Sequence, residues 1–175
     1  PASFIEMSIF PLVKNKGGDL TDINNYHAIA VSNAETKVFE KILLNRVMHY
    51  TDDDKYQFGF KAGHSATLCA GIMKDTVNYY VSKGSHVFVC FVNFSKAFDK
   101  ENYWKLFNQL LDDGISHVIV KLLSYWYCNQ AAYVVWQKLK SISFGIGNGT
   151  KQGGVLSSYL FTRYIRQLLI AISSS

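Results

Sequence analysis

The centre of the chain joins an apolar run to polar groups that are suited to chemistry. Residues 87–92 contain no charged side chain, and Asn93, Ser95 and Asp99 follow them closely. A continuous apolar run of this length is typical of a strand that is buried on both faces. We therefore expect a strand over residues 87–94 whose C-terminal end delivers side chains to a site.

A glycine-punctuated loop in the last third of the chain is a second candidate for chemistry. Gly145, Gly147 and Gly149 precede Lys151 in a pattern that hints at phosphate binding. The loop lacks the Gly-Lys-Ser/Thr sequence of a phosphate loop, and it follows a predicted hairpin instead of opening a strand–helix unit. We therefore reject the phosphate-loop interpretation.

Patterns for metal binding or disulfide formation are weak. The contiguous aspartates at 52–54 point their side chains apart, so we interpret them as a solvated turn. Cys69, Cys90 and Cys128 are widely spaced without a Cys-x-x-Cys pair, which predicts buried free thiols in a reducing compartment. No apolar stretch approaches membrane-spanning length and no signal peptide is evident. These features predict an intracellular location, in the nucleus or cytoplasm, without disulfides or membrane contact.

Charge is distributed unevenly along the 175 residues, whose net charge is +5. All 13 carboxylates precede Gly114, whereas only basic charges follow it. Such asymmetry favours contact with a polyanion, nucleic acid more than membrane. A solvated basic face is the alternative, and composition alone does not separate the two. The basic residues after Gly114 are Lys121, Lys138, Lys140, Lys151, Arg163 and Arg166.

The composition, with 49% hydrophobic residues and two prolines, fits one globular domain. The helices and strands of this domain must position the groups described above. Val38 and Ile42 of a first helix, and Val118 of a later one, recur at helical spacing and are expected on buried faces. The predicted strands are 9–13, 26–31 and a hairpin of 131–136 with 141–146. The predicted helices run from a capping box at 32–35 to 48, from Ser65 to 81, over 103–111, from Ser116 to 126 and over 156–172.

Several segments together resemble the reverse transcriptases of non-LTR retrotransposons. Residues 92–99 (Val-Asn-Phe-Ser-Lys-Ala-Phe-Asp) are similar to the strand-end motif of that family. The other similar segments follow the order of the family and extend the resemblance over nearly the whole chain. They are residues 9–17, 25–29, 37–43, 57–61 and 149–157.

The resemblance implies a nucleotidyltransferase that copies RNA into DNA with two magnesium ions. In the family, an aspartate that binds these ions stands where this chain has Asn93. Magnesium favours anionic oxygen ligands, so we expect a degenerate catalytic motif that leaves no metal site intact and binds no Mg²⁺. The other carboxylates of the family lie in an Asp-Asp hairpin beyond the loop at Gln152, and no aromatic-x-Asp-Asp sequence follows that loop here.

The resemblance also implies contacts with an RNA template, a DNA primer and a deoxynucleoside triphosphate. His27 stands where the family has an arginine, and a neutral imidazole does not reproduce a bidentate guanidinium. Phe98 corresponds to a side chain beneath the sugar, with a core position as the alternative, and Asp99 to a structural hydrogen-bonding residue. The implied nucleotide contacts are Lys14, Lys16, His27, Phe98, Gln152 and Gly153. The implied template contacts are Lys61 and Lys151, and solvated lysines are the alternative for Lys14 and Lys16.

The implied fold is α/β, with the fingers and part of the palm of a right-hand polymerase. Residues 1–84 would form the fingers and residues 85–175 the partial palm. The sequence starts at Pro1 without a methionine, so we expect a fragment. Because no aromatic-x-Asp-Asp sequence follows Gln152, we expect this fragment to lack the Asp-Asp hairpin and the thumb.

Two hypotheses follow from the resemblance. The chain is either a working reverse transcriptase domain seen incompletely, or an inactive retrotransposon remnant that binds nucleic acid through its basic residues. Asn93, His27 and the absent Asp-Asp hairpin favour the second hypothesis. A repurposed interaction protein is a third class, for which no motif argues.

Overall fold

The computed structural model describes residues 4–50 and 57–174, and it is a mixed α/β structure, as predicted. The chain divides into two compact units. The first unit combines Pro1–Thr51 with Lys96–Ile165, and the second combines Asp52–Ser95 with Arg166–Ser175. This division differs from the predicted ranges of 1–84 for the fingers and 85–175 for the palm. Those ranges describe subdomains of a polymerase, which compact units do not test, so they stay a prediction. The aspartates at 52–54 lie outside the described residues.

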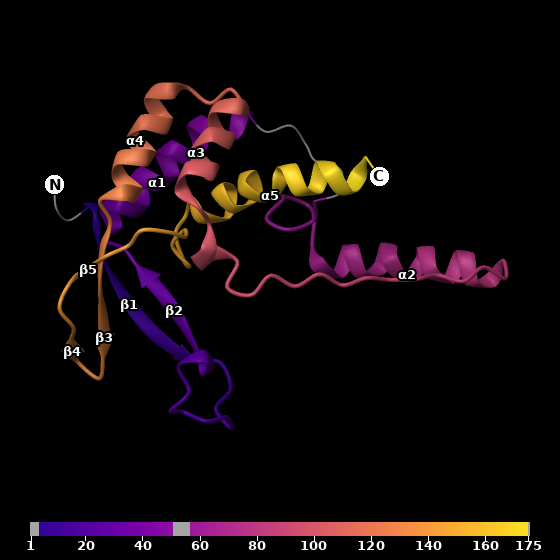
Figure 1. Ribbon diagram of the computed structural model, residues 1–175, viewed down its shortest axis with the longest axis horizontal. Coiled ribbons are helices and arrows are strands. Elements are labelled where there is room, and N and C mark those ends of the chain that lie inside the picture. Colours follow the sequence, from indigo (N-terminus) through magenta and orange to yellow (C-terminus); the bar gives the residue numbers. More distant parts are fainter. Residues whose placement is uncertain (1–3, 51–56, 175) are drawn as a thin grey trace. The chain divides into compact units, whose positions relative to one another are not determined.

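The first unit is built on a small mixed sheet (Figure 1). Its strands are β1 (Glu6–Val13), β2 (Tyr26–Val31), β3 (Ala131–Trp136), β4 (Leu139–Lys140) and β5 (Phe144–Gly145), in the order β2-β1-β3-β4, and β5 also pairs with β3. β1 and β2 form an antiparallel hairpin, whereas β1 and β3 are parallel although they come from distant parts of the sequence. The predicted strands at 9–13, 26–31 and 131–136 are confirmed.

The predicted hairpin after β3 is also present, but its return strand begins earlier than expected. β3 turns directly into β4 at Gln137 and Lys138, whose φ angles are +47° and +70°. Two residues with positive φ make a tight two-residue turn that matches the twist of paired strands. The predicted return strand at 141–146 is therefore wrong in its bounds. β4 (Leu139–Lys140) lies before that range, and only the short β5 (Phe144–Gly145) lies within it.

Four helices accompany the sheet: α1 (Ala34–Val47), α3 (Tyr103–Asp112), α4 (His117–Cys128) and α5 (Ser157–Ser173), of which α5 begins in the first unit and ends in the second. The predicted helices are confirmed. The predicted capping box is wrong by one residue, because the side chain of Asn33 and not Ser32 accepts the hydrogen bond from Thr36 N, at 2.8 Å. Gly114 follows α3 with a φ of +82°, the conformation that commonly ends a helix.

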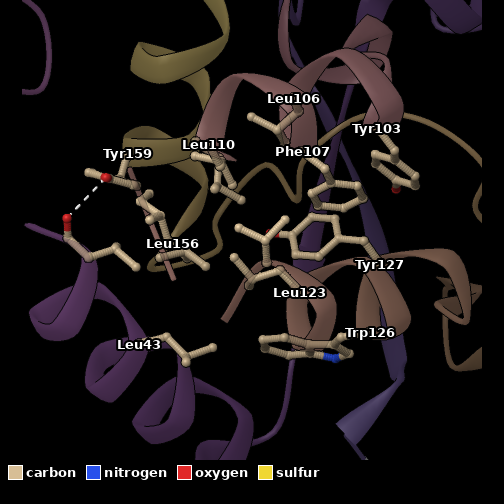
Figure 2. Close-up of a cluster of buried hydrophobic side chains, with 14 residues drawn as sticks. Leu43, Tyr103, Leu106, Phe107, Leu110, Leu123, Trp126, Tyr127, Leu156 and Tyr159 are labelled. Atoms are coloured by element: carbon tan, nitrogen blue, oxygen red, sulfur yellow. Dashed lines mark hydrogen bonds between the residues drawn. The ribbon is translucent and has the colours of Figure 1, made fainter. Parts of the chain in front are cut away.

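The hydrophobic core of the first unit lies among these helices (Figure 2). Tyr103 and Tyr127 pack edge to face with ring centroids 5.5 Å apart. The hydroxyl of Tyr159 donates to the carbonyl of Val47 at 3.1 Å, which ties the start of α5 to the end of α1. The core also contains Leu43, Leu106, Phe107, Leu110, Leu123, Trp126, Leu156 and Leu160.

The buried faces of α1 and α4 differ from those predicted. Val38 and Ile42 on α1 are 60% and 48% exposed, and Val118 on α4 is 63% exposed. The buried side chains of α1 are instead Thr36, Glu40, Leu43 and Val47. The prediction placed the most hydrophobic side chains of α1 on its buried face. In the structure, Glu40 lies on that face and pairs with Lys151, which comes 111 residues later.

The second unit contains α2 (Ala66–Ser82), which begins and ends as predicted. Ser65 Oγ accepts from Leu68 N at 3.1 Å, and Gly84 follows the helix with a φ of +78°. The predicted strand at 87–94 is wrong in this structure. Phe88 is 94% exposed, and none of the strand pairings among the described residues includes this segment. A strand requires the backbone of a partner strand as well as β-forming side chains. Residues 87–94 have the side chains but no partner strand among the described residues.

The cysteines are free but their predicted burial is wrong. Cys69, Cys90 and Cys128 are all exposed. Within residues 4–50 and 57–174, no helix is long and apolar enough to cross a membrane.

Candidate functional site

The 149–155 loop, which precedes α5, is joined to the short 3₁₀ turn Phe98–Lys100 and to Glu101. Gly149 N donates to Glu101 O at 2.9 Å, and Thr150 N donates to Phe98 O at 2.8 Å. Gly149 has a φ of +84°, and a Cβ added there would lie 2.7 Å from Phe98 O. Only glycine fits this backbone conformation and this close approach.

The same loop reaches the outer edge of β2. Ala30 N donates to Gln152 O at 3.0 Å, and a Cβ at Gly153 would lie 3.0 Å from Ala30 O. Gly153 has a φ of +110°, which again favours glycine. Three predicted nucleotide contacts, at Phe98, Gln152 and Gly153, therefore gather in one region of the first unit.

Lys151 is buried between the loop and α1. Its ammonium lies 3.3 Å from Glu40 Oε1 and 4.4 Å from the centroid of the Trp126 ring. Val155 N donates to Glu40 Oε2 at 2.6 Å, so the carboxylate holds the loop at two points. Burial lowers the pKa of Lys151, and Glu40 opposes that shift. The ammonium is engaged inside the protein, so the structure does not favour the predicted template contact by Lys151.

A pocket of about 110 Å³ lies between one face of the sheet and the loop. His27 neighbours the lining residue Ala28 in β2, and successive side chains of a strand point to opposite faces. The exposed His27 therefore lies on the sheet face opposite the pocket. The residues that line the pocket include Ile9, Ala28, Ala30, Asp99, Thr150 and Gln152.

The turn between β1 and β2 carries the two predicted lysines. Lys14 Nζ donates to Asn24 O at 2.9 Å, and Lys16 is exposed. Asn25 holds this turn, because its side chain donates to Asn15 O at 2.9 Å and accepts from Asn15 N at 3.0 Å. Asn25 is part of the 25–29 segment of the resemblance, but its role in the turn was not predicted, because its partner Asn15 lies ten residues earlier.

Phe98 packs against the start of α5. Its ring and that of Phe161 are stacked, with centroids 4.7 Å apart and planes inclined by 27°. Both rings are half-buried, so this contact leaves open whether Phe98 is a core residue or lies beneath a sugar. The neighbouring Asp99 is exposed and borders the pocket.

Asn93 and Lys61 belong to the second unit. Asn93 is exposed in the irregular segment after α2, and Lys61 is half-buried in the segment before it. The place of Asn93 at the metal-binding position of the family and the template contact of Lys61 stay predictions.

Two further acidic residues are engaged inside the first unit. Glu101 is fully buried, and Thr150 Oγ1 donates to its Oε1 at 3.0 Å. Burial raises the pKa of Glu101 to about 8, and the Thr150 bond lowers it by less. Asp113 lies 3.6 Å from Arg163 of α5 and accepts from Gln109 Nε2 at 3.0 Å. The sequence gives little sign of either role, because a charged residue among apolar ones is more often on the surface.

The donor set does not fit a magnesium site. Across the part of the chain that the structure describes, no three His, Cys, Asp or Glu side chains group closely enough to hold a metal ion. The pocket borders on Asp99, while Asn93 offers a neutral amide oxygen in place of a carboxylate. Magnesium is held mainly through anionic oxygens.

A comparison with protein families gives a match over almost the whole chain. The family model described as reverse transcriptase (RNA-dependent DNA polymerase) matches residues 13–175. The matched range includes the β1–β2 turn, the segment that ends at Asn93 and the 149–155 loop.

Proposed function

Because the chain belongs to the reverse transcriptase (RNA-dependent DNA polymerase) family, we propose that it is a retrotransposon-derived domain of the non-LTR type that binds nucleic acid without extending a primer. RNA template, DNA primer and deoxynucleoside triphosphate are the ligands of this family type. In this proposal the β1–β2 hairpin belongs to the fingers and residues 85–175 to a partial palm.

The observation that carries the binding part of the proposal is the contact between the 149–155 loop and β2. Gln152 and Gly153 approach the backbone of Ala30 closely, with 3.0 Å between Ala30 N and Gln152 O. Gly153 is nevertheless exposed, so its backbone is accessible to a nucleotide. We assign nucleotide contact to Gln152, Gly153 and the exposed lysines of the β1–β2 turn, and template contact to Lys61.

Loss of catalysis is proposed from the ligands that magnesium needs. Reverse transcriptase domains generally use Mg²⁺, and two-metal catalysis needs several carboxylates that converge on one point. Asn93 supplies no charge, and His27 replaces a guanidinium that would neutralise phosphate charge. We therefore propose that the chain retains the binding surfaces of its family and has lost the transfer reaction.

A primer-extension assay with a matched binding assay tests both parts. On a poly-A template with an oligo-dT primer and labelled thymidine triphosphate, the chain should bind the duplex at low salt and extend nothing. Asn93→Asp should also extend nothing, because one carboxylate supplies only part of a two-metal site. Millimolar Mg²⁺ should leave the melting temperature unchanged beyond the effect of sodium at matched ionic strength.

Extension by the unchanged chain, or by Asn93→Asp, would show that the catalytic carboxylates lie elsewhere. Absence of salt-dependent binding would remove the binding half of the proposal. The affinity of His27→Arg for a deoxynucleoside triphosphate tests binding separately from catalysis. A restored guanidinium should strengthen this binding whether or not a primer is extended.

A further inference from the structure

Glu101 is the most unusual buried group in the first unit. It is fully buried, and its Oε2 has no hydrogen-bond partner among the described residues. An ionised carboxylate in such a position would be strongly disfavoured, because nothing replaces its hydration. Burial of a neutral carboxylic acid without hydrogen-bond donors costs much less free energy than burial of the anion.

The groups around Glu101 do not supply a compensating positive charge. Tyr103 of α3 and Tyr127 of α4 interact with it electrostatically, and each of these tyrosines has a raised pKa partly because of Glu101. Glu40 on α1 also acts on Tyr127, and the nearby ammonium of Lys151 is already paired with Glu40. The surroundings of Glu101 are therefore neutral or acidic.

Glu101 is also placed where it holds the loop. Its backbone carbonyl accepts from Gly149 N at 2.9 Å, and its side chain accepts from Thr150 Oγ1 at 3.0 Å. The next loop residues carry Lys151 to Glu40 and Gln152 to the edge of β2. The contact between Glu101 and Thr150 thus fixes the start of the segment that presents Gln152 and Gly153.

We propose that Glu101 is a positioning residue whose protonated carboxyl group holds the 149–155 loop against the turn at residues 98–101. Ionisation of this acid places an anion under the loop whose Oε2 has no donor among the described residues. The Thr150 bond favours the anion, but by less than burial disfavours it, so ionisation favours opening of the loop, which lets water reach the carboxylate. The consequence for nucleic-acid binding rests on the function proposed above. Because the pKa of Glu101 is raised to about 8 in the closed structure, the loop is held progressively less firmly as the pH rises toward 8.

Hydrogen exchange of the Gly149 and Thr150 amides tests this anchor directly. After correction for intrinsic exchange, protection in the unchanged chain should fall by at least ~10-fold between about pH 6.5 and about pH 9.5, the factor that one pKa unit represents. Glu101→Gln keeps the shape of the side chain without its charge, so its protection should stay constant over this range. Glu35→Gln, which removes an exposed acid on α1, should behave like the unchanged chain.

Constant protection in the unchanged chain, or an equal loss in Glu101→Gln, would overturn the proposal. If Glu101→Gln does not fold, carboxyl ¹³C titration of the unchanged chain decides the question. One glutamate should titrate near pH 8, and titration of every glutamate near the ordinary value of 4.5 would contradict the proposal.

Binding of a single-stranded oligonucleotide, measured on the same samples, separates this proposal from the proposed function. Absence of binding in every sample, together with pH-dependent protection, would remove the proposed function and leave the anchor. Binding that persists while protection is independent of pH would remove the anchor and leave the function.

Discussion

Two basic residues near the end of the chain act as internal partners of acids that come much earlier. Lys151 pairs with Glu40, and Arg163 pairs with Asp113. Both basic side chains are about 5% exposed or less. A buried ion pair of this kind adds little net stability, but removal of one partner leaves an uncompensated charge.

Removal of one member of the Glu40–Lys151 pair should therefore cost more than removal of both. Glu40→Gln alone should lower the free energy of unfolding by about 3–5 kcal/mol, because the ammonium stays buried without its counter-charge. Glu40→Gln combined with Lys151→Met should recover much of that loss. Urea unfolding measures both, with Glu35→Gln as a control expected within about 0.5 kcal/mol of the unchanged chain. Additive losses in the double variant would show that the two residues do not interact.

Glu101 should also make global stability depend on pH. Its folded pKa, about 8, lies above the ordinary value of 4.5, so the unfolded chain releases this proton first as the pH rises. Stability should therefore fall between about pH 4.5 and about pH 8, by roughly 3 kcal/mol at neutral pH. Glu101→Gln should remove that slope and be more stable than the unchanged chain at pH 8. Parallel profiles for the two proteins, in urea melts over this range, would contradict the assignment.

At the scale of elements, the 149–155 loop depends on one glycine more than on the others. Gly149→Ala brings a Cβ to 2.7 Å from Phe98 O at a φ of +84°, so the turn or the loop must move. The expected loss is about 1–3 kcal/mol in the free energy of unfolding, the usual cost of left-handed backbone without glycine. Gly147→Ala is the matched control, because a Cβ there meets nothing within 4 Å. Equal losses for the two variants would show that the loop is not held against the turn.

Elements whose signals are local were predictable, and elements whose partners are distant were not. Ser65, Gly84 and Gly114 mark helix ends through bonds and φ angles within a few residues, so the bounds of α2 and α3 followed from the sequence. Residues 87–94 have the composition of a buried strand, but strand formation depends on a partner that composition does not reveal. The inward turn of Glu40 was missed for the same reason, because Lys151 lies far along the chain.

In the candidate site, some residues were also predicted from the sequence and others were not. Gln152, Gly153 and Phe98 were expected together from the resemblance, and the structure brings them into one region. The burial of Lys151 was not predicted, because a lysine beside glycines usually lies in solvent. Glu101 gave no sequence signal, since only the surrounding tyrosines and Thr150 make its carboxyl group unusual.

At the scale of the whole molecule, the basic character of the last third is smaller than its composition suggests. Of the six basic residues after Gly114, Lys151 and Arg163 are neutralised inside the protein. Lys138 and Lys140, at the β3–β4 turn, are exposed, and Lys140 lies 3.3 Å from the centroid of the Tyr133 ring. An aromatic ring beside a lysine is a surface that suits a single strand.

Nucleic-acid binding should therefore depend on the exposed lysines. The logarithm of the binding constant should fall with the logarithm of salt concentration. Lys138→Gln with Lys140→Gln should reduce that slope by up to about 0.7 for each phosphate of a single strand that is no longer neutralised. Fluorescence anisotropy with a labelled oligonucleotide at several salt concentrations measures the slope. Lys83→Gln, on the second unit, serves as a control for net charge. An unchanged slope in the double variant would place the binding surface elsewhere.

The distance in sequence between the partners of α1 has a consequence for how the chain is made. Glu40 meets Lys151 and Val155 across 111 and 115 residues, and Val47 meets Tyr159 across 112. At about 5–20 residues per second, a ribosome completes α1 on the order of ten seconds before these partners exist. During that interval the inner face of α1 carries an acid without a base. The first unit therefore closes late in synthesis, when the residues that follow β5 emerge.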